Sequence, residues 1–101
     1  MTLRIALTLE AQADVEEVHA WYAARGAALA EKFRGALDQC LEGIASFPEA
    51  HPVVHRSIRR ALLRRFPYCV FYVVERDRVV VHGCLHARRD PSIWQLRTGA
   101  G

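Results

Sequence analysis

The sequence predicts an α+β domain with the element order β-α-α-β-β-β, in which a helix hairpin packs on one face of a mostly antiparallel sheet. Two observations predict this fold. In the first half of the chain, apolar residues recur at the three- and four-residue spacing of amphipathic helices. In the last third, residues 68–75 and 79–86 form two apolar runs of strand length that meet at a short charged turn. A β-hairpin alone is marginally stable in water, so it requires a further strand or a packed helix.

The first half of the chain contains a short strand and two helices. Residues 3–7 alternate apolar with small or polar side chains, as a strand does. Thr8 can cap a first helix, which ends at Gly26. A second helix extends from about Ala27 to Ser46, because Pro48 pushes the residue before it out of the helical region. The single glycine between the helices predicts an antiparallel hairpin.

The segment after the second helix is less regular. Residues 47–56 contain two prolines and predict a loop. In the segment 57–66, Ile58, Leu62 and Phe66 share a face in either a strand or a helix, because a four-residue step fits both periods. We interpret this segment as a strand, since the hairpin that follows needs another strand beside it.

The tail from Pro91 predicts a short turn of helix followed by disorder at 98–101. A single domain therefore covers residues 1–97. The sequence offers no second layer for the sheet face opposite the helix hairpin. We expect that face to be open and basic, and to be the place where a partner binds.

Charge is distributed unevenly along the chain. Residues 1–50 carry four Lys or Arg and eight Asp or Glu, a net of −4, whereas residues 51–101 carry ten Arg and three acidic residues, a net of +7; the halves sum to +3. This asymmetry indicates a polyanion or an acidic partner for the second half. A compositional bias toward arginine would explain the excess of that residue but not its placement.

Composition excludes several classes of protein. The three cysteines form no CxxC pair and lie in apolar segments, as reduced core residues do in the cytosol. No apolar stretch approaches the roughly 20 residues of a membrane span. The first residues lack the pattern of a signal peptide. We therefore expect a cytoplasmic globular domain with no membrane partner.

Eight side chains of the second half are candidates for binding a partner. Seven are arginines, and four of these fall within the predicted strand 57–66 and its end, where clustered guanidinium groups suit a polyanion. An ordinary solvated strand is the alternative interpretation. The candidates are Arg59, Arg60, Arg64, Arg65, Arg88, Arg89, Trp94 and Arg97.

His86 is the candidate for proton transfer, because imidazole titrates near neutrality and arginines follow it closely in the sequence. The alternative is that it caps the end of its strand by a hydrogen bond to a backbone carbonyl. The histidine pairs His51/His55 and His82/His86 do not have the spacing of a zinc site, so we expect neither a metal nor a cofactor.

With these residues placed, the chain resembles the RelE/ParE superfamily of bacterial type II toxins. The specific features are Phe-Pro-Tyr at 66–68, which opens the hydrophobic strand, and the ending His-x-Arg-Arg-x-Pro-x-x-Trp at 86–94. The resemblance implies a small toxin whose cognate antitoxin wraps it with an extended C-terminal segment. Antitoxin and target would then compete for the same basic surface. It also implies a higher-order complex that binds operator DNA through the antitoxin.

The two branches of this superfamily differ in mechanism. RelE-like members cut mRNA in the ribosome, and Arg60, Arg89 and His86 would be the catalytic residues here. Two strand positions depart from that pattern, since Cys69 and Leu62 stand where RelE-like members carry cations. ParE-like members poison DNA gyrase by binding, which requires only a surface. The resemblance thus favours a ParE-like gyrase inhibitor. A ribosome-dependent endoribonuclease and an inactive member that serves only as antitoxin partner in a repressor complex remain the alternatives.

Overall fold

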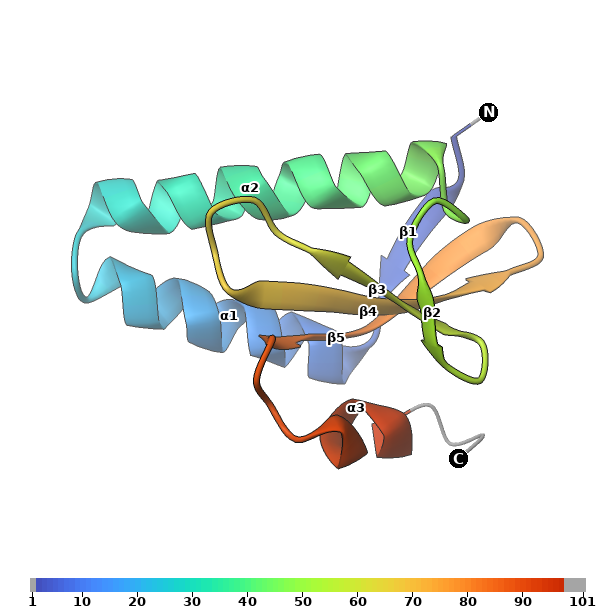
Figure 1. Ribbon diagram of the computed structural model, residues 1–101. Helices are drawn as coiled ribbons and strands as arrows, with labels where there is room; N and C mark the ends of the chain where they lie inside the picture. Colours follow the sequence, from blue (N-terminus) through green and yellow to red (C-terminus); the bar gives the residue numbers. More distant parts are fainter. Residues whose placement is uncertain (1, 98–101) are drawn as a thin grey trace.

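The computed structural model describes residues 2–97, which form three helices and a five-stranded mixed sheet (Figure 1). The strand order is β1-β5-β4-β3-β2, with β1 parallel to β5 and the other neighbouring pairs antiparallel. This confirms the predicted α+β fold. In chain order the elements are β1 (Arg4–Leu7), α1 (Leu9–Ala23), α2 (Ala27–Ser46), β2 (Val53–His55), β3 (Ile58–Leu62), β4 (Tyr68–Glu75), β5 (Arg78–His86) and α3 (Pro91–Arg97).

Local signals set the ends of the two long helices. Thr8 Oγ1 accepts a hydrogen bond from the Ala11 N–H at 3.1 Å and caps α1. Gly26 separates α1 from α2 with a φ of 156°, which residues with a side chain rarely adopt. The two helices therefore turn back on each other and run side by side over one face of the sheet (Figure 1). The predicted helix hairpin is confirmed.

The first core lies between the helix hairpin and the sheet. Its centre is a group of rings from Tyr22, Phe33, Phe66 and Tyr68, whose centroids lie 5.1 to 6.2 Å apart. Phe33 is fully buried, and burying such a side chain stabilises the fold by roughly 1.5–3 kcal/mol. This ring group ties α1 and α2 to the beginning of β4.

The prediction of a continuous loop over residues 47–56 is wrong in one part. Val53–His55 forms β2, which pairs antiparallel with β3 at the edge of the sheet. Val53 lies opposite Arg59 and His55 lies opposite Ile58, with an irregularity between them. A strand of three residues shows no readable alternation, and its pairing depends on a segment that comes later in the chain.

The ambiguous segment 57–66 contains β3, so the strand interpretation is confirmed. The predicted turn of helix after Pro91 is also confirmed, as α3. The disorder predicted for 98–101 lies outside the described residues. Across residues 2–97, no helix combines the length and the apolarity needed to cross a membrane.

The expectation of an open second sheet face is wrong. We call the face opposite α1 and α2 the second face. It carries its own core, made by Ile58, Cys69, Phe71 and Leu85, all less than 5% exposed, and α3 covers it through Trp94. A seven-residue helix with two apolar neighbours in its middle has no periodic stripe, so the sequence did not reveal this cover.

A β-bulge at His82 divides β5 into two parts. Phe71 lies opposite Gly83 while Tyr72 lies opposite Val81, which leaves His82 without a partner in the ladder. Parallel pairing with β1 also stops at Val81. The rest of β5 is therefore paired with β4 on one side only, and it presents an open edge next to α1.

Candidate interaction surface

The turn between β3 and β4 presents two arginines to solvent. Leu63 is buried and its N–H donates to the Tyr68 carbonyl at 2.9 Å, while Phe66 packs among the rings of the first core. Arg64 and Arg65 lie between these two apolar anchors and are exposed. Arg65 adopts a φ of 67°, in the left-handed region. Because Leu63 and Phe66 pack inward on either side, Arg64 and Arg65 are held at the surface above α2.

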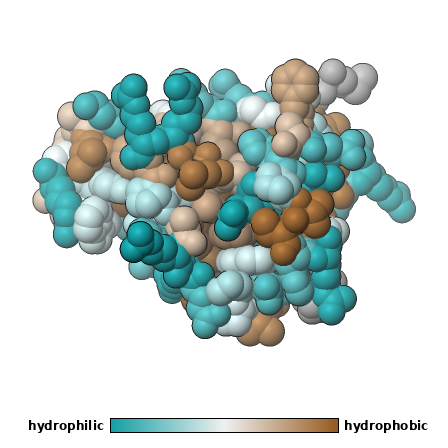
Figure 2. All heavy atoms as spheres, viewed as in Figure 1, coloured by the Kyte–Doolittle hydropathy of each residue, from teal (hydrophilic) through white to brown (hydrophobic). Residues whose placement is uncertain are grey.

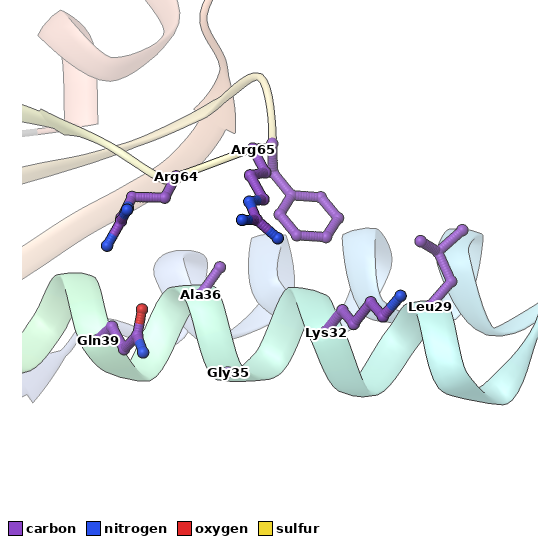
Figure 3. Close-up of a pocket in the computed structure, with 8 residues that line it drawn as sticks. Leu29, Lys32, Gly35, Ala36, Gln39, Arg64 and Arg65 are labelled. Atoms are coloured by element: carbon purple, nitrogen blue, oxygen red, sulfur yellow. The ribbon is translucent and has the colours of Figure 1, made fainter.

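A groove runs between this turn and the outer side of α2, and Figure 3 shows its first part. Two hollows of about 610 and 520 Å³ compose it, and they share Ala36, Gln39 and Arg64. We call their combined surface the α2 groove. Its lining residues are Leu29, Lys32, Gly35, Ala36, Gln39, Cys40, Glu42, Gly43, Ser46, Phe47, His51, Leu62, Arg64, Arg65 and Phe66.

The α2 groove combines exposed apolar side chains with basic ones. Phe47 and Leu62 are 71% and 61% exposed, although side chains of this kind are ordinarily buried. Figure 2 shows apolar groups, in brown, exposed among hydrophilic ones on one face of the molecule. Gly35 and Gly43 leave open space where a Cβ would be, so the α2 backbone can be closely approached.

Charge at the α2 groove is unbalanced. Lys32, Arg64 and Arg65 contribute three positive charges, against one negative charge from Glu42. Within residues 2–97, no ion pair neutralises Arg64 or Arg65. Such a groove suits a segment with apolar side chains on one face and carboxylates along its edge.

Arg59 has an internal function. Its Nη1 donates to the backbone carbonyls of Glu49 and His51, at 3.2 and 2.6 Å, and its side chain is only 21% exposed. It therefore holds the loop after α2 against β3. This loop carries Phe47 and His51, two residues of the α2 groove, so Arg59 helps to position one end of the groove.

Arg60 lies on the second face of the sheet. It pairs with Phe71, a residue of the second-face core, and it is exposed. Successive residues of a strand point to opposite faces, so Arg60 points away from the helix hairpin.

His86 lies at the end of β5 on the other face. Its ring meets that of Tyr68 edge-to-face at 5.4 Å, and Tyr68 packs against the first core. His86 Nδ1 accepts the Arg88 N–H at 3.1 Å, where a bond to a carbonyl was the expectation. Nε2 is the nitrogen left for other partners. A polar hollow of about 180 Å³ brings together His86, Arg89 and the acidic side of α1.

The structure thus brings His86 and Arg89 together and does not bring Arg60 to them. His86 and Arg89 line one hollow, whereas Arg60 lies across the sheet. Burial raises the pKa of the neighbouring Tyr68 hydroxyl above its usual value, so this phenol stays protonated at neutral pH. Among residues 2–97, no three His, Cys, Asp or Glu side chains gather as a metal site requires.

Trp94 and Arg97 have partners inside the protein. The Trp94 ring is 6% exposed and lies against Phe71, with centroids 4.6 Å apart and planes 13° apart. Arg97 forms a bidentate ion pair with Asp14, in which Nη2 lies 3.1 Å from Oδ1. Trp94 is therefore covered, and Arg97 is held by Asp14 at the polar hollow that His86 also lines. Arg88 and Arg89, in the exposed connection before α3, do.

Sequence reasoning missed the α2 side of the groove. The only sequence signal for it is the row of small residues Gly35, Ala36 and Gly43 on the solvent side of an otherwise regular helix, with Phe47 directly after it. These small residues indicate a groove only once the turn that carries Arg64 is known to lie above them.

Comparison with known proteins identifies the class to which this fold and surface belong. The family model described as ParE toxin of type II toxin-antitoxin system, parDE, matches residues 5–91. The match covers most of the chain and defines a toxin component of a type II toxin–antitoxin system. The chain belongs to the ParE toxin family, within the RelE/ParE superfamily that its sequence resembles.

A solved structure shares the fold. It is described as the chromosomal ParDE TA system from P. aeruginosa, with a TM-score of 0.74 and 16% sequence identity. The similarity covers 84% of this chain and 96% of that chain. No curated protein matches the sequence.

Proposed function

We propose that this protein inhibits growth by binding DNA gyrase in the cytoplasm, without chemistry of its own, and that a cognate antitoxin neutralises it. The observation that carries the proposal is the position of Arg60, across the sheet from His86 and Arg89. The family supports the toxin class. The placement of the three side chains supports binding over catalysis.

Cleavage of RNA by attack of a 2′-hydroxyl needs a base, a cation and an acid around one phosphate. On this chain, Arg60 and His86 lie on opposite faces of the sheet. His86 and Arg89 offer one imidazole and one guanidinium, next to Glu17 and to the Asp14–Arg97 ion pair. The Arg97 guanidinium is already bound to Asp14, and the Glu17 carboxylate beside a phosphate would oppose its binding, which weakens the case for an endoribonuclease.

The antitoxin is proposed to occupy the α2 groove. A C-terminal segment with apolar side chains would cover Phe47 and Leu62, and its carboxylates would pair with Arg64 and Arg65. Covering these groups would bury two large apolar side chains that are exposed in the isolated protein. Operator DNA would then be bound by the antitoxin in the assembled complex.

The first experiment is induction of the chain alone in a bacterial host, with pulse labelling of DNA and protein synthesis. Early arrest of DNA synthesis, followed by loss of supercoiling activity when purified gyrase is mixed with the toxin, is the expected result. Immediate loss of translation with ribosome-dependent mRNA cuts would replace the proposal by the endoribonuclease alternative. Normal growth would favour the inactive antitoxin partner.

Two variants separate chemistry from binding in the same assay. His86→Ala removes the only imidazole of the polar hollow and should leave toxicity intact if the protein acts by binding. Arg60→Ala tests the catalytic candidate that lies on the other face of the sheet. Toxicity lost in both variants, with the folded protein still present, would indicate catalysis.

A further inference from the structure

Two contacts of the C-terminal helix α3 with the rest of the protein lie at separate places. One is the Trp94 ring on the second face, where it stacks on Phe71 and meets the His55 ring at 6.1 Å. The other is the Arg97 guanidinium, which reaches Asp14 on α1. Between α3 and β5, residues 87–90 are exposed. The helix thus lies across the second face like a strap, and we use that name for residues 91–97.

The Arg97 contact passes around the open edge of β5. Asp14 Oδ2 accepts a hydrogen bond from the Cys84 N–H at 3.0 Å. No strand accepts from this N–H, because the pairing of β1 with β5 ends before the bulge. The same carboxylate binds Arg97, whose Nη1 also donates to the His82 carbonyl at 3.3 Å. Gly83 leaves the room for this approach, since a Cβ there would lie 3.0 Å from Arg97 Nη1.

The strap has its own start signal. Asp90 Oδ1 accepts the Ser92 N–H at 3.0 Å, and the Asp90 carbonyl accepts the Ile93 N–H at 3.1 Å. A helix of seven residues is nevertheless unstable in isolation, because nucleation is unfavourable and few bonds follow it. Its helical state therefore depends on its contacts with the rest of the protein, and Trp94 and Arg97 make two of them.

What lies beneath the strap would be exposed without it. Ile58, Cys69, Phe71 and Leu85 form a compact apolar group on β3, β4 and β5, and Trp94 is the large ring that covers it. The first core contains no residue of α3, since its residues come from α1, α2, the strands β1, β3, β4 and β5, and the segments next to them. The two cores lie on opposite sides of the sheet, so one can open while the other stays packed.

We propose that α3 is a releasable strap that opens and closes over the second-face core while the rest of the protein remains folded, and that the Asp14–Arg97 ion pair holds it closed. The proposal concerns this chain's own conformations and does not depend on gyrase binding or on the antitoxin. The closed state hides an apolar surface that a partner could reach only after strap opening. The strength of the ion pair determines the fraction of molecules in which the strap is open and that surface is exposed.

Two buried cysteines provide an internal test. Cys69 lies in the second-face core and Cys84 lies in the first core, and each is 1% exposed. The purified full chain is treated with iodoacetamide, and the alkylation rate of each thiol is followed by peptide mass spectrometry. Strap opening should expose Cys69 and leave Cys84 protected.

Urea concentrations below the unfolding transition distinguish local from global opening in the unaltered protein. The rate of Cys84 alkylation should rise steeply with urea, because it requires global unfolding. That of Cys69 should be faster and nearly independent of urea, as local opening exposes little surface. Identical urea dependence of the two thiols would overturn the proposal, because α3 would then unfold only with the whole domain.

Arg97→Met tests the ion pair and keeps most of the side chain length. It should raise the Cys69 alkylation rate at least fivefold and leave the Cys84 rate unchanged. The Cys69 alkylation rate of Arg97→Lys should lie between those of the unaltered protein and Arg97→Met. The matched control is Arg88→Met, which removes the same charge from an exposed position four residues before Ser92 and should change neither rate. Equal acceleration of both cysteines in Arg97→Met, or no acceleration of Cys69, would overturn the proposal.

Discussion

The hydroxyl of Tyr72 donates a hydrogen bond to the carbonyl of Pro48 at 2.7 Å, and this bond joins the centre of β4 to the loop after α2. Tyr72 is fully buried. Its ring belongs to the first core while its hydroxyl reaches the segment that carries Phe47, so one side chain connects the core with the end of the α2 groove.

Tyr72→Phe should destabilise the protein by about 1–2 kcal/mol, because the Pro48 carbonyl loses its donor while the ring remains. Urea unfolding followed by circular dichroism measures this difference. Tyr68→Phe is the matched control, since the Tyr68 hydroxyl makes no hydrogen bond within residues 2–97 and its removal should change stability by less than about 0.5 kcal/mol. Equal effects of the two substitutions would contradict the assignment.

Phe33→Ala should destabilise the protein by about 3–5 kcal/mol, since it opens a cavity in the middle of the ring group of the first core. The thermal unfolding midpoint measures the loss. Phe47→Ala changes the same residue type at a position that is 71% exposed and should leave the midpoint almost unchanged. A large loss of stability in the Phe47 variant would mean that this ring is covered in the isolated toxin.

Charge reversal at the rim of the α2 groove should weaken antitoxin binding. Arg65→Glu is expected to raise the dissociation constant about tenfold, or about 1.4 kcal/mol, measured by titration calorimetry with the antitoxin's C-terminal segment. Arg76→Glu is a close control, because Arg76 is also exposed and also has a positive φ, of 47° against 67° for Arg65, but lies in the β4–β5 turn. Similar weakening by both variants would show that only the net charge matters.

Stability should fall at alkaline pH because of the buried thiols. Burial, with a further contribution from Asp14, raises the pKa of Cys84 from 9.0 to about 12. A raised pKa adds stability that is fully present below pH 9 and is lost as pH rises toward 12. For Cys84 the loss between pH 8 and pH 10 is about 1.4 kcal/mol. Urea unfolding of Cys84→Ala should show a correspondingly smaller loss over this range; an unchanged loss would exclude this thiol as its cause.

Stability should also fall at mildly acidic pH. Burial at the β-bulge lowers the pKa of His82 from its usual 6.5. The unfolded chain then binds the proton more readily than the folded protein, so this contribution is present above pH 6.5 and is lost as pH decreases below it. Unfolding midpoints at pH 7.0 and pH 5.5 measure the loss. His82→Gln should make the two midpoints more similar, and no change in their difference would contradict the prediction.

Local signals made much of the fold predictable. Both long helices were predictable from the cap at Thr8, the glycine at position 26 and the apolar stripes. Two long, mostly apolar runs predict the strands β4 and β5. Each of these features is decided by neighbours in sequence.

The features that the sequence did not reveal are those that join distant segments. Asp14 and Arg97 are 83 positions apart, and nothing near either residue indicates the other. The α2 groove exists because the turn at Arg64 lies above Ala36. The same limit explains Trp94, which was expected at the surface as a binding residue and instead fills the second-face core. The α2 groove is likewise assembled by tertiary packing, so the arginine positions in the sequence did not indicate its shape.

The parallel pairing of β1 with β5 has a consequence for synthesis. Residues 4–7 find their partners at residues 78–81, so a growing chain has no place for its first strand until more than three quarters of it has left the ribosome. Contacts between such distant segments carry a large loop-closure entropy and slow the folding of the sheet. A nascent chain stopped before the β4–β5 turn therefore cannot complete the sheet, and a truncated translation product of this gene is expected to be harmless to the cell that makes it.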